Sequence, residues 1–242
     1  SPKPTTTMIE FKDIEKSFGR QSVLSGINLK FDQPGIFAIL GPNGSGKTTL
    51  IKSLMGMVYP SAGEIWIDGH LKKGNEYRNS IAYLPQIARF PENLSVSEFL
   101  SFIENIRGKG NRKEELSATF GLNDFKDKKL RTLSGGMRQK VNLVSALMYD
   151  THTIILDEPT IGLDPIALIN LKNWIRKEKE AGKTILLTTH IMDIVQELAD
   201  EIVFILEGKV YYRGSQEELL SQTQTENTEQ AIAQLLSLQK AS

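Results

Sequence analysis

Apolar and polar positions follow two different patterns along the chain, and together they predict an α/β fold. Continuous apolar runs are typical of parallel strands that are covered on both faces, and four are present: 36–40, 81–84, 153–156 and 184–189. Alternation at 8–31 and 64–68 instead predicts strands with one buried face, which indicate an antiparallel layer beside a parallel core. Further strands are expected at 201–206 and 209–212, separated by a turn at 207–208.

The character of the chain becomes helical after Gln86. Residues 95–98, Ser-Val-Ser-Glu, have the spacing of a capping box, and the apolar positions there recur on one helical face: Val96, Phe99, Leu100 and Ile103. The segment 107–113, rich in glycine and charge, is typical of a loop with solvated charges. We therefore expect a helical subdomain at about 88–150, inserted into one domain that covers 8–220.

Both ends of the chain differ from this domain. Residues 1–7 are polar and contain two prolines, which predicts a flexible lead. Within the C-terminal tail, 221–242, the polar stretch 222–230 is typical of a mobile segment. Residues 231–238 predict a short helix with three apolar residues on one side: Ile232, Leu235 and Leu236. Packing of this helix on the chain's own core is favoured, and contact with a partner stays open.

A glycine-rich loop at 41–48 carries the first candidate chemistry. It reads Gly-Pro-Asn-Gly-Ser-Gly-Lys-Thr, follows the apolar run 36–40 and opens the helical spacing of 49–55, an order that predicts a phosphate-binding loop. Glycines let consecutive backbone N–H groups converge on phosphate oxygens at a helix N-terminus. Lys47 would neutralise the β- and γ-phosphates, and Thr48 would ligate Mg²⁺. An ordinary glycine-rich turn is disfavoured, because all eight positions and both flanks agree.

Two carboxylates, Asp157 and Glu158, end the apolar run at 153–156. Side chains at the carboxyl end of a parallel strand face the crevice where α/β sheets bind ligands. Asp157 would hold Mg²⁺, and Glu158 would orient and deprotonate the attacking water. The alternative is a surface turn before Pro159, where acidic residues are common. The matching phosphate loop makes that alternative the weaker one.

The segment 133–139 reads Leu-Ser-Gly-Gly-Met-Arg-Gln and opens a helical run that continues to 147. Between the phosphate loop and the acidic pair, it resembles the signature motif of the nucleotide-binding subunits of ATP-binding-cassette (ABC) transporters. The resemblance runs from about Met8 to Leu220. Met137 stands where the family has Gln, and the three residues expected to act are intact: Ser134, Gly135 and Gly136.

The resemblance and the residues themselves support different interpretations of the signature. By resemblance they complete the nucleotide site of the opposite subunit, so that two ATP molecules lie between two chains. Physically, a hydroxyl and bare N–H groups at a helix start form a second anion site. From the residues alone, a helix N-cap at Ser134 with nothing bound stays open. The resemblance also implies a P-loop NTPase (RecA-like) core with ATPase activity.

Four further positions match the family, and the resemblance implies their roles. Gln86 follows the strand at 81–84, where the family has a Mg²⁺ ligand and hinge. His190 follows an apolar strand, where the family keeps a catalytic histidine near the γ-phosphate, and Asp164 lies in a segment that crosses the dimer interface. Phe18 stands where an aromatic ring stacks on adenine, with a core phenylalanine as the competing interpretation. The full set expected to contact ATP is Phe18, Gly41, Asn43, Gly44, Ser45, Gly46, Lys47, Thr48, Thr49 and Gln86.

The composition of the chain argues against several other classes of function. Lysine and arginine number 29, as do aspartate and glutamate, and a net charge of zero argues against a nucleic-acid groove. The absence of cysteine excludes disulfides and thiolate metal sites in this sequence and fits a cytosolic protein. No apolar run approaches the roughly 18 to 20 residues that a membrane helix needs. A membrane channel would therefore come from another polypeptide.

These features predict an ATP-hydrolysing, energy-coupling subunit of an ABC transporter that uses ATP and Mg²⁺. It would act on the cytoplasmic face of the membrane as a homodimer, or with a paralogous cassette, together with polytopic permease subunits. The segment 86–91 and the helix after it would form the groove that receives a helix of the permease. The resemblance is greatest to cassettes of ABC-2-type, NosF-like systems. The alternative is a non-transport cassette of the iron–sulfur assembly or cell-division type.

Overall fold

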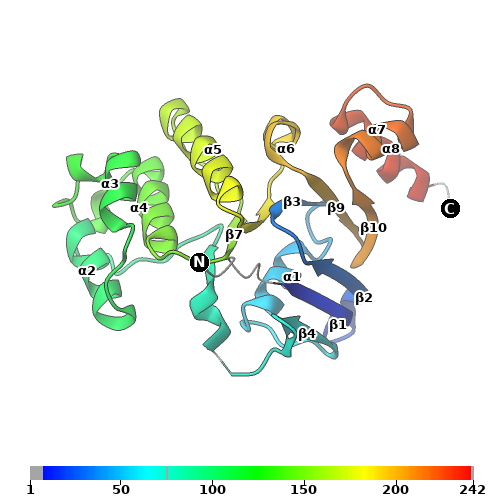
Figure 1. Ribbon diagram of the computed structural model, residues 1–242, viewed down its shortest axis with the longest axis horizontal. Coiled ribbons are helices and arrows are strands. Elements are labelled where there is room, and N and C mark those ends of the chain that lie inside the picture. Colours follow the sequence, from blue (N-terminus) through cyan, green and yellow to red (C-terminus); the bar gives the residue numbers. More distant parts are fainter. Residues whose placement is uncertain (1–7, 75, 241–242) are drawn as a thin grey trace.

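The computed structural model describes residues 8–74 and 76–240, and the flexible lead predicted at 1–7 lies outside them. Two β-sheets form the centre of the molecule (Figure 1). The smaller one is antiparallel, with the order β2 (Gln21–Phe31), β1 (Ile9–Phe18), β4 (Ala62–Ile67) and β5 (His70–Leu71). The larger one has the order β10 (Lys209–Gly214), β9 (Glu201–Leu206), β3 (Gly35–Leu40), β8 (Thr184–Thr188), β7 (Thr153–Asp157) and β6 (Ile81–Leu84).

The larger sheet is parallel except for the β9–β10 pair, and both of its faces are covered. Neighbouring residues of β3 point to opposite faces. Ile36 joins the apolar cluster formed with the helices, and Phe37 joins the cluster that contains the antiparallel sheet. Helix α1 (Lys47–Leu54) packs into this second cluster with both sheets. Burial on both faces explains the continuous apolar runs, and the strands and the antiparallel layer predicted from the pattern are confirmed.

A group of helices occupies one side of the molecule, away from the antiparallel sheet (Figure 1). Its helices are α2 (Val96–Arg107), α3 (Lys113–Thr119) and α4 (Gly135–Leu147), with the short 3-10 turns η2 (Leu122–Asp124) and η3 (Leu130–Thr132). The capping box before α2 is confirmed, because Ser95 Oγ accepts from Glu98 N and Ser95 N donates to the Glu98 carboxylate. Helix α5 (Pro165–Glu180) lies between this group and α6 (Met192–Leu198). A further 3-10 turn, η1 (Glu76–Ser80), precedes β6.

The prediction of solvated charges at 107–113 is wrong for its last two residues. Arg112 Nη1 lies 2.7 Å from the carboxylate of Glu178, which is 2% exposed, and Lys113 Nζ lies 2.6 Å from Glu104. Their partners lie on other elements, so the sequence of the loop could not reveal them. Arg112 therefore connects the start of α3 to the last turn of α5.

The polar stretch 222–230, expected to be mobile, contains the end of α7 (Gln216–Thr223), a connection at 224–227 and the start of α8 (Thr228–Lys240). The polar residues there act in turns and caps; Asn227 Oδ1, for example, accepts from Gln230 N at 2.9 Å. The side of α8 that carries Ile232 and Leu235 packs against an apolar cluster to which α6, α7, β9 and β10 contribute. Packing of the tail on the chain's own core is confirmed.

Candidate functional site

A cavity of about 140 Å³ lies at the carboxyl ends of β3, β6, β7 and β8. This is the edge at which open α/β sheets bind ligands. It brings together segments that are far apart in the chain, and its lining residues are Val23, Asn43, Gly44, Ser45, Gly46, Lys47, Thr48, Thr49, Gln86, Asp157, Glu158 and His190. Eleven of these twelve are residues that the sequence predicts to act on ATP or Mg²⁺.

The phosphate loop takes a shape that requires glycine at two points. A Cβ on Gly41 would lie 2.1 Å from the carbonyl oxygen of Ile205, so β9 blocks any side chain there. Gly46, at a φ of 108°, stands at the N-cap of α1 and supplies no side chain to cap the helix. The N–H groups of the first turn therefore have no side-chain acceptor among the described residues. A helix N-terminus of this kind can bind an anion through those groups.

Lys47 is 8% exposed and bends back onto the loop that carries it. Its Nζ donates to the carbonyl oxygen of Gly41 at 2.6 Å and to that of Pro42 at 3.1 Å. Burial lowers the pKa of the Lys47 ammonium from its ordinary value, and the carboxylates of Glu158 and Asp157 act in the opposite direction. The hydroxyl of Ser45 is buried, and none of the residues that the structure describes forms a hydrogen bond with it. An uncapped helix start, a buried cation and an unpaired hydroxyl fit a polyphosphate.

Thr188, at the end of β8, positions both carboxylates of the acidic pair. Its Oγ1 donates to Asp157 Oδ1 at 2.5 Å, and its Oγ1 and carbonyl oxygen each lie 3.1 Å from the backbone nitrogen of Glu158. Glu158 has a left-handed φ of 51°, which is uncommon for a residue other than glycine. This turn directs the Glu158 side chain into the cavity together with Asp157.

The Glu158 carboxyl is buried and faces His190. His190 Nε2 lies 3.1 Å from Glu158 Oε1, and the imidazole itself is 55% exposed. Burial raises the pKa of Glu158 above its ordinary value, and a charge on His190 opposes that rise. A carboxylate with a raised pKa is a stronger base than a solvated one, as general base catalysis requires.

Two of the residues expected to contact ATP do not line the cavity. Gly41 lies in the loop that encloses it, and Phe18, at the end of β1, is 52% exposed. This exposure rules out the interpretation of Phe18 as a core residue. Lys16 Nζ lies 4.9 Å from the centre of its ring, within the range of a cation–π contact.

The signature residues lie outside the cavity of their own chain. Ser134 caps α4, and its Oγ accepts from Met137 N at 3.3 Å. Ser134 and Gly135 are exposed, and a Cβ on Gly136 would lie 2.7 Å from the carbonyl oxygen of Gly162. The N-cap interpretation is therefore confirmed as local structure, and the helix start that it creates is open to solvent.

Asp164 connects the signature helix to α5. It caps α5 by accepting from Ala167 N at 2.8 Å, and its other oxygen lies 2.6 Å from Lys140 Nζ on α4. The hydrogen bond from Lys140 lowers the pKa of Asp164 from its ordinary value. The segment predicted to cross a dimer interface is thus fixed to the same helix as the signature.

Sequence reasoning missed two residues that shape this site. Val23 lines the cavity from β2, and nothing distinguishes it from other apolar residues of a strand. Thr188 holds the acidic pair, and the threonines before His190 were the only signal that could have pointed to it. Both act through a neighbouring strand, which the sequence does not identify.

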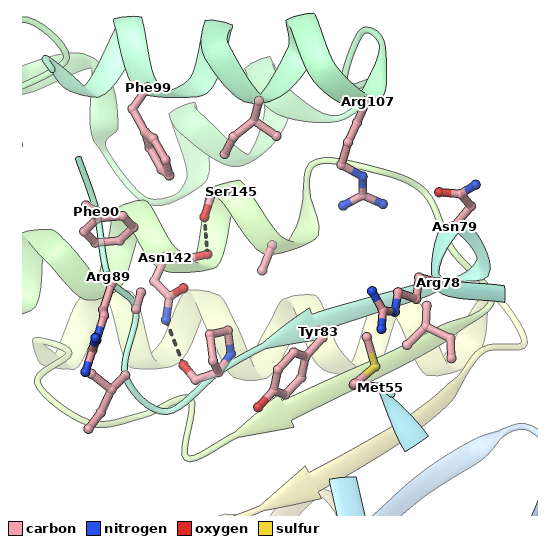
Figure 2. A pocket seen from close by; sticks show the side chains of 16 residues that line it. Met55, Arg78, Asn79, Tyr83, Arg89, Phe90, Phe99, Arg107, Asn142 and Ser145 are labelled. Atoms are coloured by element: carbon pink, nitrogen blue, oxygen red, sulfur yellow. Dashed lines mark hydrogen bonds between the residues drawn. The ribbon is translucent and has the colours of Figure 1, made fainter. Parts of the chain in front are cut away.

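A larger groove of about 480 Å³ lies between the end of β6, α2 and α4 (Figure 2). Its apolar floor includes Phe90 and Phe99, whose rings meet edge to face with centres 5.1 Å apart. Three arginines, Arg78, Arg89 and Arg107, line it, and none of the described residues that line it is acidic. The groove lies where the segment 86–91 and the following helix were expected to form one.

The fold and the cavity define a class: a P-loop ATPase with an acidic pair beside the phosphate loop. A family model described as ABC transporter matches residues 24–161. The chain belongs to this family, as one of its ATP-binding cassettes, and it is an ATPase of the kind that powers transport. In the described residues, 8–74 and 76–240, no helix is both long and apolar enough to cross a membrane.

Several known proteins are similar over most of their length. The daunorubicin resistance ATP-binding protein DrrA3 of Streptomyces coeruleorubidus is 34% identical over 90% of this chain and 71% of that protein. The Nod factor export ATP-binding protein I of Ralstonia nicotianae is 33% identical over 90% and 70%. A solved structure of an ATP-binding subunit of an ABC transporter has a TM-score of 0.85 at 28% identity, covering 95% of this chain and 99% of that one.

Proposed function

We propose that this ATPase works as a dimer that encloses two ATP molecules, formed with a second copy of itself or with a paralogous cassette. The observation that carries the proposal is the division of the site. The cavity collects Lys47, Glu158 and His190, whereas Ser134 and its glycines form an exposed helix start elsewhere on the same chain. Residues from a facing chain would complete the cavity around the γ-phosphate.

In the proposed dimer, each chain supplies a distinct part of the reaction. Lys47 exchanges its contacts with the loop carbonyls for phosphate oxygens, and the first-turn N–H groups of α1 hold the same charge. Glu158 accepts a proton from the attacking water, and His190 lies close enough to orient that carboxylate. The partner's signature helix start contributes two more N–H groups and a hydroxyl.

The cavity also fits Mg²⁺. Thr48, Gln86 and Asp157 line it together and offer a hydroxyl, an amide and a carboxylate oxygen, which are the ligands that this ion prefers. When bound, Mg²⁺ neutralises phosphate charge. The hydroxyl that Thr188 donates to Asp157 orients the carboxylate for this role.

We further propose that the groove of Figure 2 binds a cytoplasmic segment of a polytopic membrane subunit, so that the chain sits on the cytoplasmic face of the membrane. Ile87 is 78% exposed at the edge of the groove, where a segment bound in the groove would cover it. Arg89 and Arg107 supply unopposed positive charge. The occupant is therefore an amphipathic segment with at least one acidic residue.

Export is the direction that the similar proteins favour. Their names describe drug resistance and Nod factor export. This supports an ABC-2-type system for the present chain, and the NosF-like subgroup stays a prediction. The membrane subunit would select the substrate, because eleven of the twelve residues that line the cavity are ones expected to act on ATP or Mg²⁺.

Isolation of the tagged chain from gently solubilised native cells tests the proposal, with partners identified by mass spectrometry. We expect a polytopic membrane protein in stoichiometric amount. Arg89→Glu combined with Arg107→Glu should reduce its recovery at least about tenfold, because like charges then face each other. Lys209→Glu, an exposed charge change on β10, is the matched control. A soluble assembly without a membrane protein would favour a non-transport cassette and contradict the transport role.

A further inference from the structure

Two buried amide side chains on the signature helix do not line the nucleotide cavity. Gln139 and Asn142 are 9% and 3% exposed, and they stand three positions apart on one face of α4. A buried amide is costly unless its polar atoms are bonded. Their hydrogen-bond partners therefore show which segments of the chain this face of the helix positions.

Both partners are proline carbonyls at the margin of the nucleotide cavity. Gln139 Nε2 donates to the oxygen of Pro159 at 2.9 Å, and Asn142 Nδ2 donates to the oxygen of Pro85 at 3.0 Å. Pro159 directly follows Glu158, and Pro85 directly precedes Gln86. The Asn142 amide also lies 3.5 Å from Gln139 Oε1, which joins the two contacts. One helix face thus holds the chain beside the general base and beside a predicted Mg²⁺ ligand.

Asn142 also lines the arginine-rich groove on its other side (Figure 2). Figure 2 shows the side-chain amide of Asn142 bonded to the backbone at the end of β6. The hydroxyl of Ser145 donates to the backbone carbonyl oxygen of Asn142 at 2.9 Å. A segment that fills the groove would touch Asn142 directly. A shift of this amide would be passed to Pro85 and, through Gln139, to Pro159.

We propose that Gln139 and Asn142 are positioning residues that transmit occupancy of the groove to Gln86 and Glu158 in the nucleotide cavity. The inference rests on the proposed function, because it requires ATP in the cavity and a partner in the groove. Gln139 and Asn142 would influence the rate of ATP hydrolysis, whereas the phosphate loop would determine the affinity for ATP.

Gln139→Met and Asn142→Leu test this role, since both keep the side-chain size and remove the amide donor. We expect kcat for ATP hydrolysis to fall at least about tenfold while KM for ATP stays within about twofold. Asn170→Leu is the matched control: Asn170 Nδ2 donates to the oxygen of Thr119 at 2.8 Å, between α5 and the end of α3 and away from the cavity. Its kcat should stay within about twofold of the parent.

Hydrogen exchange separates transmission from a loss of stability. In the parent protein, ATP should slow exchange both in the phosphate loop at 43–49 and in the groove segment at 86–90. In Asn142→Leu the response at 86–90 should disappear while the response at 43–49 remains. If Asn142→Leu does not fold, the kinetic comparison of Gln139→Met with Asn170→Leu tests the assignment, because Gln139 does not line the groove.

Parent values of kcat and a parent exchange response in the folded variants would overturn the assignment, as would an equal loss of kcat in Asn170→Leu. Failure of the proposed ATP site would look different. The parent protein itself would then show no protection of 43–49 by ATP.

Discussion

At the scale of single residues, the charged side chains of the ATP site make contacts within the chain that a nucleotide can replace. Lys47 donates to two carbonyl oxygens of its own loop, and Ser45 Oγ is buried without a partner in the described part of the chain. Glu158 keeps a left-handed φ and a carboxyl with a raised pKa. Strained backbone and shifted pKa values of this kind concentrate at functional sites.

Lys47→Ala should weaken ATP binding by about tenfold to a hundredfold, because one charge-assisted contact contributes about 1.5 to 3 kcal/mol. Isothermal titration with ATP measures this directly. Lys52→Ala, at the other end of α1, is the control for a lost positive charge. Equal ATP affinity in the parent and Lys47→Ala would remove Lys47 from the proposed role.

The pH dependence of hydrolysis should report Glu158. Only its charged form accepts a proton, so kcat falls as pH drops through the pKa of Glu158, and burial places that pKa above the ordinary 4.5. A protonated His190 opposes the rise. His190→Ala should therefore move the acid limb of the kcat profile to higher pH, whether or not the maximal kcat also changes. An acid limb that does not move would contradict this pairing.

At the scale of elements, buried charge joins the helical group to the rest of the molecule. Glu178 on α5 pairs with Arg112 at the start of α3 and with Lys183 before β8. The side chain of Glu178 is 3% exposed, so little solvent screens these pairs. By contrast, Glu197 on α6 pairs with Lys172 on α5 near the surface, where its side chain is 37% exposed.

Glu178→Ala should lower the free energy of unfolding by about 3 to 5 kcal/mol, because Arg112 and Lys183 lose their buried partner and keep only the exposed carboxylates of Glu115 and Asp150. Glu197→Ala, which removes two exposed ion pairs, with Lys172 and with Arg176, should cost less than about 1 kcal/mol. Urea denaturation of the two variants gives both values. Similar losses in the two would show that burial of Glu178 is not what makes its contacts important.

At the scale of the whole molecule, the two halves of the proposed site lie apart on one chain. Asp164 fixes α5 to the signature helix through Lys140, and Gly136 packs against the carbonyl of Gly162. The exposed start of α4 and the segment before α5 therefore form one unit. A unit of this kind can close on a facing chain without changing its internal contacts.

Glu158→Gln should bind ATP, lose about 10²- to 10⁴-fold in kcat, and accumulate as a closed dimer, because the general base is absent while the phosphate contacts remain. Analytical ultracentrifugation with ATP measures the dimer. Adding Ser134→Arg to this variant should return it to the monomer, since a long side chain would fill the exposed helix start. Hydrolysis by Glu158→Gln at the parent rate would show that another group is the base.

Much of the site could be predicted from local sequence, because the glycines at 41–48 and the acids after 153–156 act within a few residues of the chain. The same holds for the strands, whose apolar runs reflect burial on both faces. Predictions failed where a partner was distant. The charge of Arg112 is paired through α5, and the polar stretch at 222–230 joins two helices whose apolar side chains share one cluster with α6, β9 and β10.

The sequence by itself determined the ATPase class, the order of the strands along the chain and the residues of the phosphate loop, since each depends on short-range patterns. Only the tertiary structure decided which strands are neighbours, and hence that Thr188 holds Asp157 and Glu158. It also decided that Gln139 and Asn142 hold the chain on two sides of the cavity. Hydrogen bonds between segments 20 to 60 residues apart depend on packing, which a local pattern does not contain.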